Sequence, residues 1–170
     1  MSYAIESIAK SIGARRVGKH KATIDWLLTD SRSLSFPEET LFFALTTKRN
    51  SGARYIPDLY DRGVRNFVIT EEDFKEVENG ELRVESSLNF LIVPNPLKAL
   101  QKLAETHRDK FKIPVIGITG SNGKTIVKEW LHQLLSPDRC IVRSPRSYNS
   151  QIGVPLSVWQ LSEEAELGIF

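Results

Sequence analysis

Apolar and polar positions along the chain form a repeated succession of short apolar runs and amphipathic segments. Short, almost wholly apolar runs are typical of strands that are buried on both faces of a sheet. Such runs occupy residues 41–45, 90–93, 113–118, 140–142 and 167–170, and further strands are expected over 24–28 and 64–69. Apolar residues recur at helical spacing over 5–12, 53–62, 96–107, 126–135 and 154–161. Strands that alternate with helices predict an α/β fold, with parallel pairing in the second part of the chain.

Residues at the ends of these segments predict where helices start and stop. Ser2 is the expected N-cap of the first helix and Gly13 its end, while Asn95 is expected to cap the helix that begins at Pro96. The acidic stretch 71–85 is expected to form an exposed connection or hairpin. The charged segment Arg-Asp-Lys-Phe-Lys at 108–112 marks a change of composition, so we expect one domain over 1–108 and a second over 109–170.

Composition narrows the functional classes. The chain has 170 residues and a net charge of +2, so bulk electrostatics favours neither nucleic acid nor a membrane surface. It has no apolar run near the roughly 20 residues that span a bilayer, and its first residues lack the pattern of a secretory signal. We therefore expect a cytoplasmic protein without membrane insertion. Cys140 is the sole cysteine, which excludes an internal disulfide, and it is expected to be a buried small hydrophobe.

The most informative motif is the glycine-rich segment 117–125, Gly-Ile-Thr-Gly-Ser-Asn-Gly-Lys-Thr, between a predicted strand and a predicted helix. Glycines let the backbone turn sharply and point N–H groups inward, and the following helix N-terminus adds positive potential. Lys124 is placed to reach nucleotide phosphates, and the Thr125 hydroxyl is placed to bind Mg²⁺. The strict phosphate-loop pattern is not met, because Ile118 stands where it requires glycine. The alternative is a plain strand-to-helix turn.

A second candidate site follows the predicted strand 24–28, in the polar segment Thr-Asp-Ser-Arg-Ser at 29–33. Ligands of α/β sheets gather at the carboxyl ends of strands. Arg32 is a candidate phosphate clamp and Ser31 a candidate hydroxyl donor. On this triplet alone, an Asp30–Arg32 pair that orders the turn is the favoured alternative. The basic pair at 48–49 either faces an anion or is solvated. His107 is expected at a helix end, without a role as a ligand.

Taken together, four segments resemble the Mur ligases of peptidoglycan synthesis: Thr-Asp-Ser-Arg at 29–32, Leu-Phe-Phe-Ala-Leu at 41–45, Gly52 before a helix, and Thr-Gly-Ser-Asn-Gly-Lys-Thr at 119–125. Two further stretches, 95–104 and 124–129, are similar to the members that add D-alanyl-D-alanine to UDP-MurNAc-tripeptide. The members that add the third amino acid and a non-catalytic nucleotide-binding module are the alternatives. A small-molecule kinase would carry the strict phosphate-loop pattern, which this chain lacks. The folate polyglutamate ligases begin close to their glycine loop, whereas about a hundred residues precede the loop in this chain.

The resemblance implies an organisation for the chain. Residues 1–108 correspond to an α/β UDP-MurNAc-peptide-binding domain, and 109–170 to the first part of a P-loop-type parallel α/β ATP-binding domain. The chain is therefore expected to be a truncated part of a monomeric three-domain enzyme. The family's magnesium-binding glutamate, its carbamylated lysine and its third domain are expected beyond Phe170. Some relatives carry a fused alanine racemase downstream, and the sequence leaves open whether this protein does.

The resemblance also implies chemistry and site residues. ATP phosphorylates the terminal carboxylate of the sugar-peptide, and the amine of D-alanyl-D-alanine then displaces phosphate from the acyl phosphate. The implied ATP-binding residues are Thr119, Gly120, Ser121, Asn122, Gly123, Lys124 and Thr125, with Lys124 catalytic and Thr125 on Mg²⁺. The implied UDP-sugar-binding residues are Ser31, Arg32, Gly52 and Asn149. This chain departs from the family at 46–47, where Thr-Thr replaces glycine, and at 51–52, where Ser-Gly replaces Asp-Gly. Contacts to uridine and diphosphate in 46–51 therefore stay open.

Overall fold

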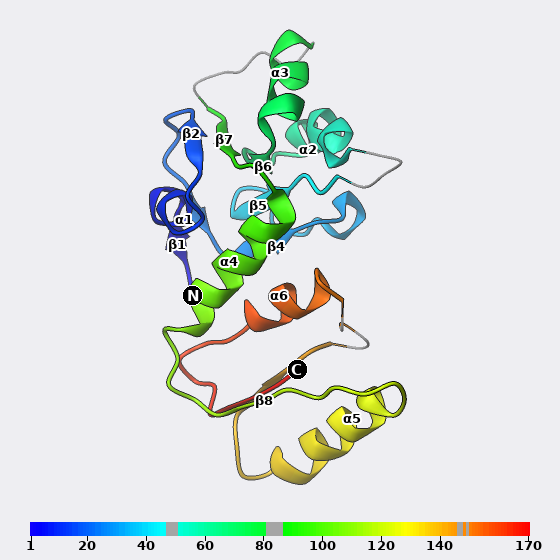
Figure 1. Ribbon diagram of the computed structural model, residues 1–170. Helices are drawn as coiled ribbons and strands as arrows, with labels where there is room; N and C mark the ends of the chain where they lie inside the picture. The colour runs from blue at the N-terminus through cyan, green and yellow to red at the C-terminus, as the bar shows by residue number, and fades with distance from the viewer. Residues whose placement is uncertain (47–50, 81–86, 146–147, 149) are drawn as a thin grey trace. The chain divides into compact units, whose positions relative to one another are not determined.

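The computed structural model describes residues 1–46, 51–80, 87–145, 148 and 150–170. The chain divides into two compact units, Met1–Lys102 and Leu103–Phe170, which Figure 1 shows in blue to green and in green to red. The division falls within helix α4 (Pro96–Arg108), ahead of the change of composition at 108–112. Each unit has its own sheet, and each is described here by itself.

The first unit is built on a five-stranded sheet with the order β2-β7-β6-β5-β4. Its strands are β2 (Arg15–Val17), β4 (Trp26–Leu28), β5 (Thr40–Phe43), β6 (Asn66–Ile69) and β7 (Asn89–Ile92). Strands β4 to β7 pair in parallel, and β2 joins the edge antiparallel to β7. Every residue of β5, β6 and β7 is buried, as the apolar runs predicted. A separate antiparallel pair joins β1 (Tyr3–Ala4) to β3 (Thr23–Ile24).

The helices of this unit are α1 (Ile5–Ser11), α2 (Ile56–Asp61), α3 (Glu71–Asn79) and most of α4, with short 3₁₀ turns at Ser31–Ser33 and Gly52–Tyr55. The prediction for the acidic stretch was wrong, because most of it forms α3. Thr70 caps this helix by accepting a hydrogen bond from the backbone N–H of Asp73 at 3.1 Å. Acidic side chains in the first turn also complement the positive end of the helix dipole.

Two predicted helix caps had different outcomes. Ser2 does not cap α1, because Ala4 occupies the N-cap position and makes no side-chain bond there. Asn95 does cap α4, with its Oδ1 accepting from the backbone N–H of Lys98 at 2.9 Å. At the other end of α1, Gly13 has φ +65°, the left-handed conformation that commonly ends a helix.

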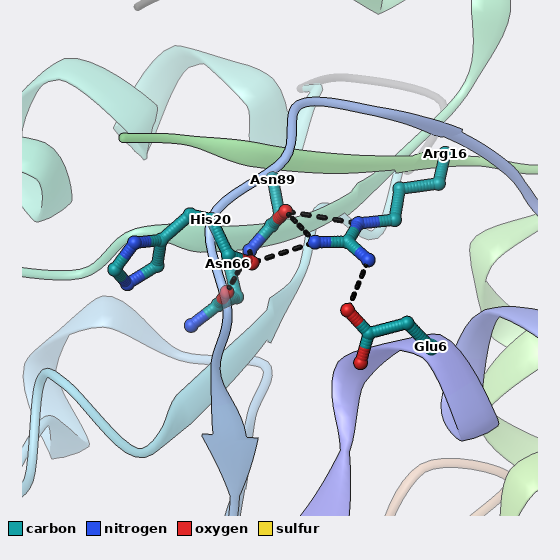
Figure 2. A network of polar contacts seen from close by, with 5 residues as sticks. All are labelled: Glu6, Arg16, His20, Asn66 and Asn89. Carbon is teal, nitrogen blue, oxygen red and sulfur yellow. Dashed lines mark hydrogen bonds and ion pairs between the residues drawn. The ribbon is translucent and has the colours of Figure 1, made fainter. Parts of the chain in front are cut away.

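A polar network crosses the amino ends of the buried strands (Figure 2). Asn66 and Asn89 are register partners at the first positions of β6 and β7, and both are fully buried. Asn89 donates to Asn66 Oδ1 at 2.8 Å and to the backbone carbonyl of His20 at 2.9 Å. Its own Oδ1 accepts from Arg16 Nε and Nη2 at 3.0 and 2.8 Å, and Arg16 also pairs with Glu6. The network thus satisfies polar groups that would otherwise be buried without partners.

The second unit contains a three-stranded parallel sheet with the order β8-β10-β9. Its elements are β8 (Val115–Ile116), α5 (Lys124–Leu135), β9 (Ile141–Arg143), α6 (Gly153–Val158) and β10 (Leu167–Ile169). The parallel pairing confirms the prediction for this part of the chain. A small apolar core joins Phe111, Leu161 and Ala165. None of the helices in the described part of the chain is long and apolar enough to cross a membrane.

One prediction in this unit was wrong and another was confirmed. Cys140 is exposed, because it precedes β9 instead of lying within it. His107 lies in the last turn of α4, at the helix end where it was predicted, is 1% exposed and lies 3.1 Å from the backbone carbonyl of Leu161. Its ring also packs on Phe111 and Trp159, with centroids at 5.0 and 4.7 Å. Burial lowers the pKa of His107 to about 4, so the ring is neutral at pH 7.

Candidate phosphate-binding site

The glycine-rich segment leaves the sheet at β8 and enters α5, which is the strand–loop–helix context expected from the sequence. Two of its glycines have backbone conformations that other residues rarely adopt: Gly120 has φ +148° and Gly123 has φ +79°. Gly123 occupies the N-cap of α5, and its carbonyl accepts from the Val127 N–H at 2.9 Å. The loop therefore delivers the chain directly to the N-terminus of a twelve-residue helix, where unpaired N–H groups favour an anion.

A cavity of about 590 Å³ opens beside this loop. Four of the predicted ATP-binding residues line it: Thr119, Gly120, Lys124 and Thr125. The other three predicted residues of the loop are exposed and lie outside the lining: Ser121, Asn122 and Gly123. The structure therefore brings the two ends of the motif to one cavity and leaves its middle on the surface.

The cavity is cationic. Its lining, within the residues that the structure describes, includes the two lysines Lys124 and Lys128 and no acidic side chain. Lys124 Nζ donates to the Gly120 carbonyl at 2.5 Å, so the side chain lies back along the loop. The exposed Thr125 offers a hydroxyl in the first helical turn. A cationic cavity at a helix N-terminus suits a polyanionic ligand such as a nucleotide phosphate chain.

Lys128 was missed by the sequence interpretation. It is 5% exposed and is the buried residue of α5, where Nζ donates to the Ser144 carbonyl at 2.6 Å. Burial lowers the pKa of the Lys128 ammonium, and the neighbouring Glu129 carboxylate opposes that shift. A signal was present, because residues four apart on a helix share a face. Lys128 lies four positions after Lys124, so this spacing could have placed both lysines on one side of the helix.

The Asp-Ser-Arg segment forms a short 3₁₀ turn after β4, and Asp30 orders it. Asp30 Oδ1 accepts from the backbone N–H of Arg32 at 3.1 Å, and the Arg32 guanidinium pairs with the carboxylate at 2.5 Å. The hydrogen bonds from the Arg32 side chain and then from its backbone lower the pKa of Asp30 to about 2. The local pair expected as the alternative is thus present. The Arg32 side chain is nevertheless 87% exposed and accessible to an anion.

Gly52 is buried and has a steric reason to be glycine. A Cβ atom at this position would lie 2.7 Å from the Leu45 backbone nitrogen, and the Gly52 N–H donates to the Leu45 carbonyl at 3.0 Å. This contact holds Gly52 just beyond the carboxyl end of β5, while Ser31 and Arg32 follow the carboxyl end of the adjacent parallel strand β4. Three of the four predicted UDP-sugar residues therefore share one sheet edge. The fourth, Asn149, and the basic pair at 48–49 lie outside the described residues.

Comparison with known proteins gives a consistent set of relatives. No protein-family model matches the chain. The UDP-N-acetylmuramoyl-tripeptide–D-alanyl-D-alanine ligase of Borreliella burgdorferi is 34% identical over 132 residues, which cover 78% of this chain and 28% of that protein. The enzyme of the same name from Synechocystis is 34% identical over 146 residues, covering 86% of this chain and 30% of that protein.

Solved structures agree with these relatives. A crystal structure of MurF from Acinetobacter baumannii superposes with a TM-score of 0.82 at 21% identity and covers all of this chain and 35% of its own. MurF ligase from Thermotoga maritima, solved in complex with ADP, gives a TM-score of 0.65 at 25% identity over 84% of this chain and 30% of its own.

The chain spans 28% to 30% of the length of the first relatives that it matches. Within that span the likeness covers both units, because the Synechocystis match includes 86% of the chain and the Acinetobacter superposition all of it. The sequence motifs, the parallel α/β fold and the named relatives therefore agree, and the chain belongs to the Mur ligase family, in the region that it shares with ligases that add D-alanyl-D-alanine.

Proposed function

We propose that this chain supplies the nucleotide-phosphate site and the UDP-sugar-binding unit of an ATP-dependent ligase that joins D-alanyl-D-alanine to UDP-MurNAc-tripeptide in peptidoglycan precursor synthesis. The observation that carries the proposal is the loop 117–123, which ends at the N-terminus of α5 beside a cationic cavity. The 34% identity to ligases of that name supports the substrate assignment. The ligase is proposed to act as a cytoplasmic monomer on small-molecule substrates.

The proposed ATP site uses the loop as an electrostatic cradle. Lys124 exchanges its bond to the Gly120 carbonyl for a phosphate oxygen, and the first N–H groups of α5 donate to neighbouring oxygens. An amide forms from a carboxylate and an amine only after activation of the acid, and positioning together with charge neutralisation is the main contribution of the protein. Lys124 is therefore proposed as the catalytic residue of this chain, because its ammonium would neutralise negative charge on the phosphoryl group during the transfer.

Mg²⁺ fits this site through a single protein ligand. Mg²⁺ commonly binds one or two protein oxygens together with substrate phosphates and waters, and the Thr125 hydroxyl lines the cavity. The described residues contain no group of three acidic, histidine or cysteine side chains that could hold a metal ion by themselves. Thr125 is therefore the residue proposed to hold Mg²⁺ with the nucleotide, and the ion would neutralise charge on the phosphates.

The 170-residue chain is proposed to bind without turning over ATP. The described lining of the cavity contains no acidic side chain or histidine that could accept the proton of an incoming amine. We expect no phosphate release when the isolated chain is incubated with ATP, Mg²⁺, UDP-MurNAc-tripeptide and D-alanyl-D-alanine. Measurable ligation under these conditions would show that the described residues already suffice for catalysis.

Binding titrations test the two proposed sites separately. Lys124→Ala should weaken ATP binding by about tenfold or more and leave UDP-MurNAc-tripeptide and UMP binding unchanged, because a charge-assisted contact is lost at one site. Arg32→Ala should have the reverse effect. Lys112→Ala, which removes an exposed lysine, is the matched control and should bind both ligands normally. If neither Arg32→Ala nor Lys124→Ala changes an affinity, the site assignment is wrong.

A further inference from the structure

A second polar pair lies on the wall of the same cavity and is not among the residues assigned above to ATP or Mg²⁺. It consists of Lys128, from the second turn of α5, and Ser144, which directly follows β9. Both residues are buried, with exposed fractions of 5% and 3%. The Lys128 Nζ to Ser144 carbonyl bond of 2.6 Å ties the helix to the end of the strand. The pair is therefore held in place by the fold.

The hydroxyl of Ser144 is the feature that needs an explanation. Its backbone groups are both satisfied, because the N–H donates to the Ile169 carbonyl at 3.1 Å and the carbonyl accepts from Lys128. Its Oγ is buried and has no hydrogen-bond partner among the residues that the structure describes. A buried hydroxyl without a partner is costly and uncommon in folded proteins. Because Ser144 lines the cavity, a ligand in the cavity is the natural partner.

Lys128 supplies the charge beside this hydroxyl. The carboxylate of the neighbouring Glu129 lies 3.8 Å from Nζ, beyond hydrogen-bond distance, and is also in contact with Arg143. Burial lowers the pKa of the Lys128 ammonium, and an anion bound beside it would oppose that shift. A negatively charged oxygen in the cavity would compensate both the ammonium and the hydroxyl.

We propose that Lys128 Nζ and Ser144 Oγ form a subsite for an anionic oxygen of the bound ligand, with the hydroxyl donating a hydrogen bond and the ammonium supplying charge. The subsite rests on the proposed function, which places a nucleotide and a carboxylate substrate in this protein. It extends that function, because it adds a second cationic contact one helical turn beyond Lys124. The anionic oxygen belongs either to a nucleotide phosphate or to the carboxylate of the sugar-peptide.

Ser144→Ala is the decisive variant because a structural role and a ligand role predict opposite results. Removing a buried hydroxyl that lacks a protein partner should leave the melting temperature unchanged or raise it. The same substitution should weaken ligand binding about fivefold to tenfold, since one hydrogen bond to a charged oxygen is lost. Ser136→Ala, at an exposed serine that ends α5, is the matched control and should change neither quantity.

Lys128→Met tests the charge with little change in side-chain volume. It should weaken binding of the same ligand by about tenfold or more, and Lys128→Arg should restore part of the affinity. Lys112→Met is the matched control at an exposed lysine. Each variant is titrated calorimetrically, as the 170-residue chain, with ADP in the presence of Mg²⁺ and separately with UDP-MurNAc-tripeptide. A loss confined to ADP assigns the oxygen to phosphate, and a loss confined to the sugar-peptide assigns it to the carboxylate.

The outcomes separate the two proposals. If the unsubstituted chain binds one of these ligands and neither Ser144→Ala nor Lys128→Met weakens that binding, the subsite is wrong and the proposed function stands. If Ser144→Ala lowers the melting temperature while affinities stay constant, the hydroxyl has a structural role and the subsite is likewise wrong. If the unsubstituted chain binds neither ligand, the proposed function fails together with the subsite.

Discussion

The two units use buried residues in different ways. In the first unit, β5, β6 and β7 are buried at every position, and aromatic rings fill the space beside them. Phe67 stacks on Phe90 at 5.5 Å and meets Phe42 edge-on at 6.4 Å. This sheet is organised for burial, and the candidate ligand residues Ser31 and Arg32 lie in a turn at its edge.

In the second unit, the principal helix has the opposite arrangement. The buried residue of α5 is Lys128, whereas several of its large apolar side chains are exposed, at fractions of 57% for Ile126, 64% for Trp130 and 72% for Leu134. The described core of this unit is small. The position of α5 therefore follows from its attachment to the glycine loop and from its contact with the end of β9, more than from burial of an apolar face. The comparison teaches that the second unit is organised around its cavity.

The largest expected effect tests the difference between the two cores. Phe67→Ala should lower the free energy of unfolding by about 4–5 kcal/mol, because a fully buried ring in a rigid parallel sheet leaves a cavity. Phe111→Ala, in the small core of the second unit, should cost about 3 kcal/mol or less, since this partly open site can collapse more easily. Urea unfolding followed by circular dichroism measures both. Equal losses would contradict the proposed contrast.

The second effect concerns pH and the second unit alone. The pKa of His107, ordinarily 6.5, is lowered to about 4 mainly by burial, so the unfolded chain takes up the proton first as pH falls. Above pH 6.5 the neutral ring of His107 contributes its full stabilisation to the fold. This contribution falls by about 3 kcal/mol at most as the pH is lowered from 6.5 through 4. His107→Phe should flatten the pH dependence of unfolding over this interval. His20→Phe, at an exposed histidine, is the control and should keep the original profile.

The features that the sequence predicted well are those set by neighbouring residues. The apolar runs predicted the buried strands β5, β6 and β7, and Asn95 before Pro96 predicted the start of α4. The polar edge strand β2 and the acidic helix α3 were missed, because neither has an apolar pattern. Strand β2 is defined by its pairing with β7, and α3 begins at its cap, Thr70. Contacts distant in sequence were also missed: the partner of His107 lies 54 residues further along the chain.

The candidate sites show the same limit. The strand, glycine loop and helix were predicted from the order of residues in one short segment, because the residues that form the turn and bind phosphate are neighbours in the sequence. The contact between Lys128 and Ser144 was not predicted, because it depends on how β9 meets α5 in space. The Asp30–Arg32 pair was anticipated as an alternative, and the structure places it in the turn, with the Arg32 side chain 87% exposed.

A third expected effect returns to the first unit and its polar network. Asn89→Ala should lower the free energy of unfolding by about 1–3 kcal/mol, because Arg16 and Asn66 each lose a hydrogen-bond partner in a buried setting. Asn79→Ala, at an exposed asparagine ending α3, should change stability by less than about 0.5 kcal/mol. Urea unfolding of both variants makes the comparison. A similar cost for both would show that the network contributes nothing beyond ordinary surface contacts.

The smallest effect on stability, and the sharpest spectroscopic one, concerns the turn at the sheet edge. Arg32→Ala removes the main cause of the low pKa of Asp30, which should rise from about 2 part of the way towards 3.8, since the backbone hydrogen bond stays. Because the folded-state pKa is lowered, the pair stabilises the fold above pH 3.8 and loses that contribution as pH falls through about 2. The exposure of both side chains limits the contribution to less than about 1 kcal/mol. Carboxyl NMR titration measures the shift. Arg62→Ala, which removes a contact to the Ser31 carbonyl, is the control, and a pKa of Asp30 that is equal in both variants would contradict the assignment.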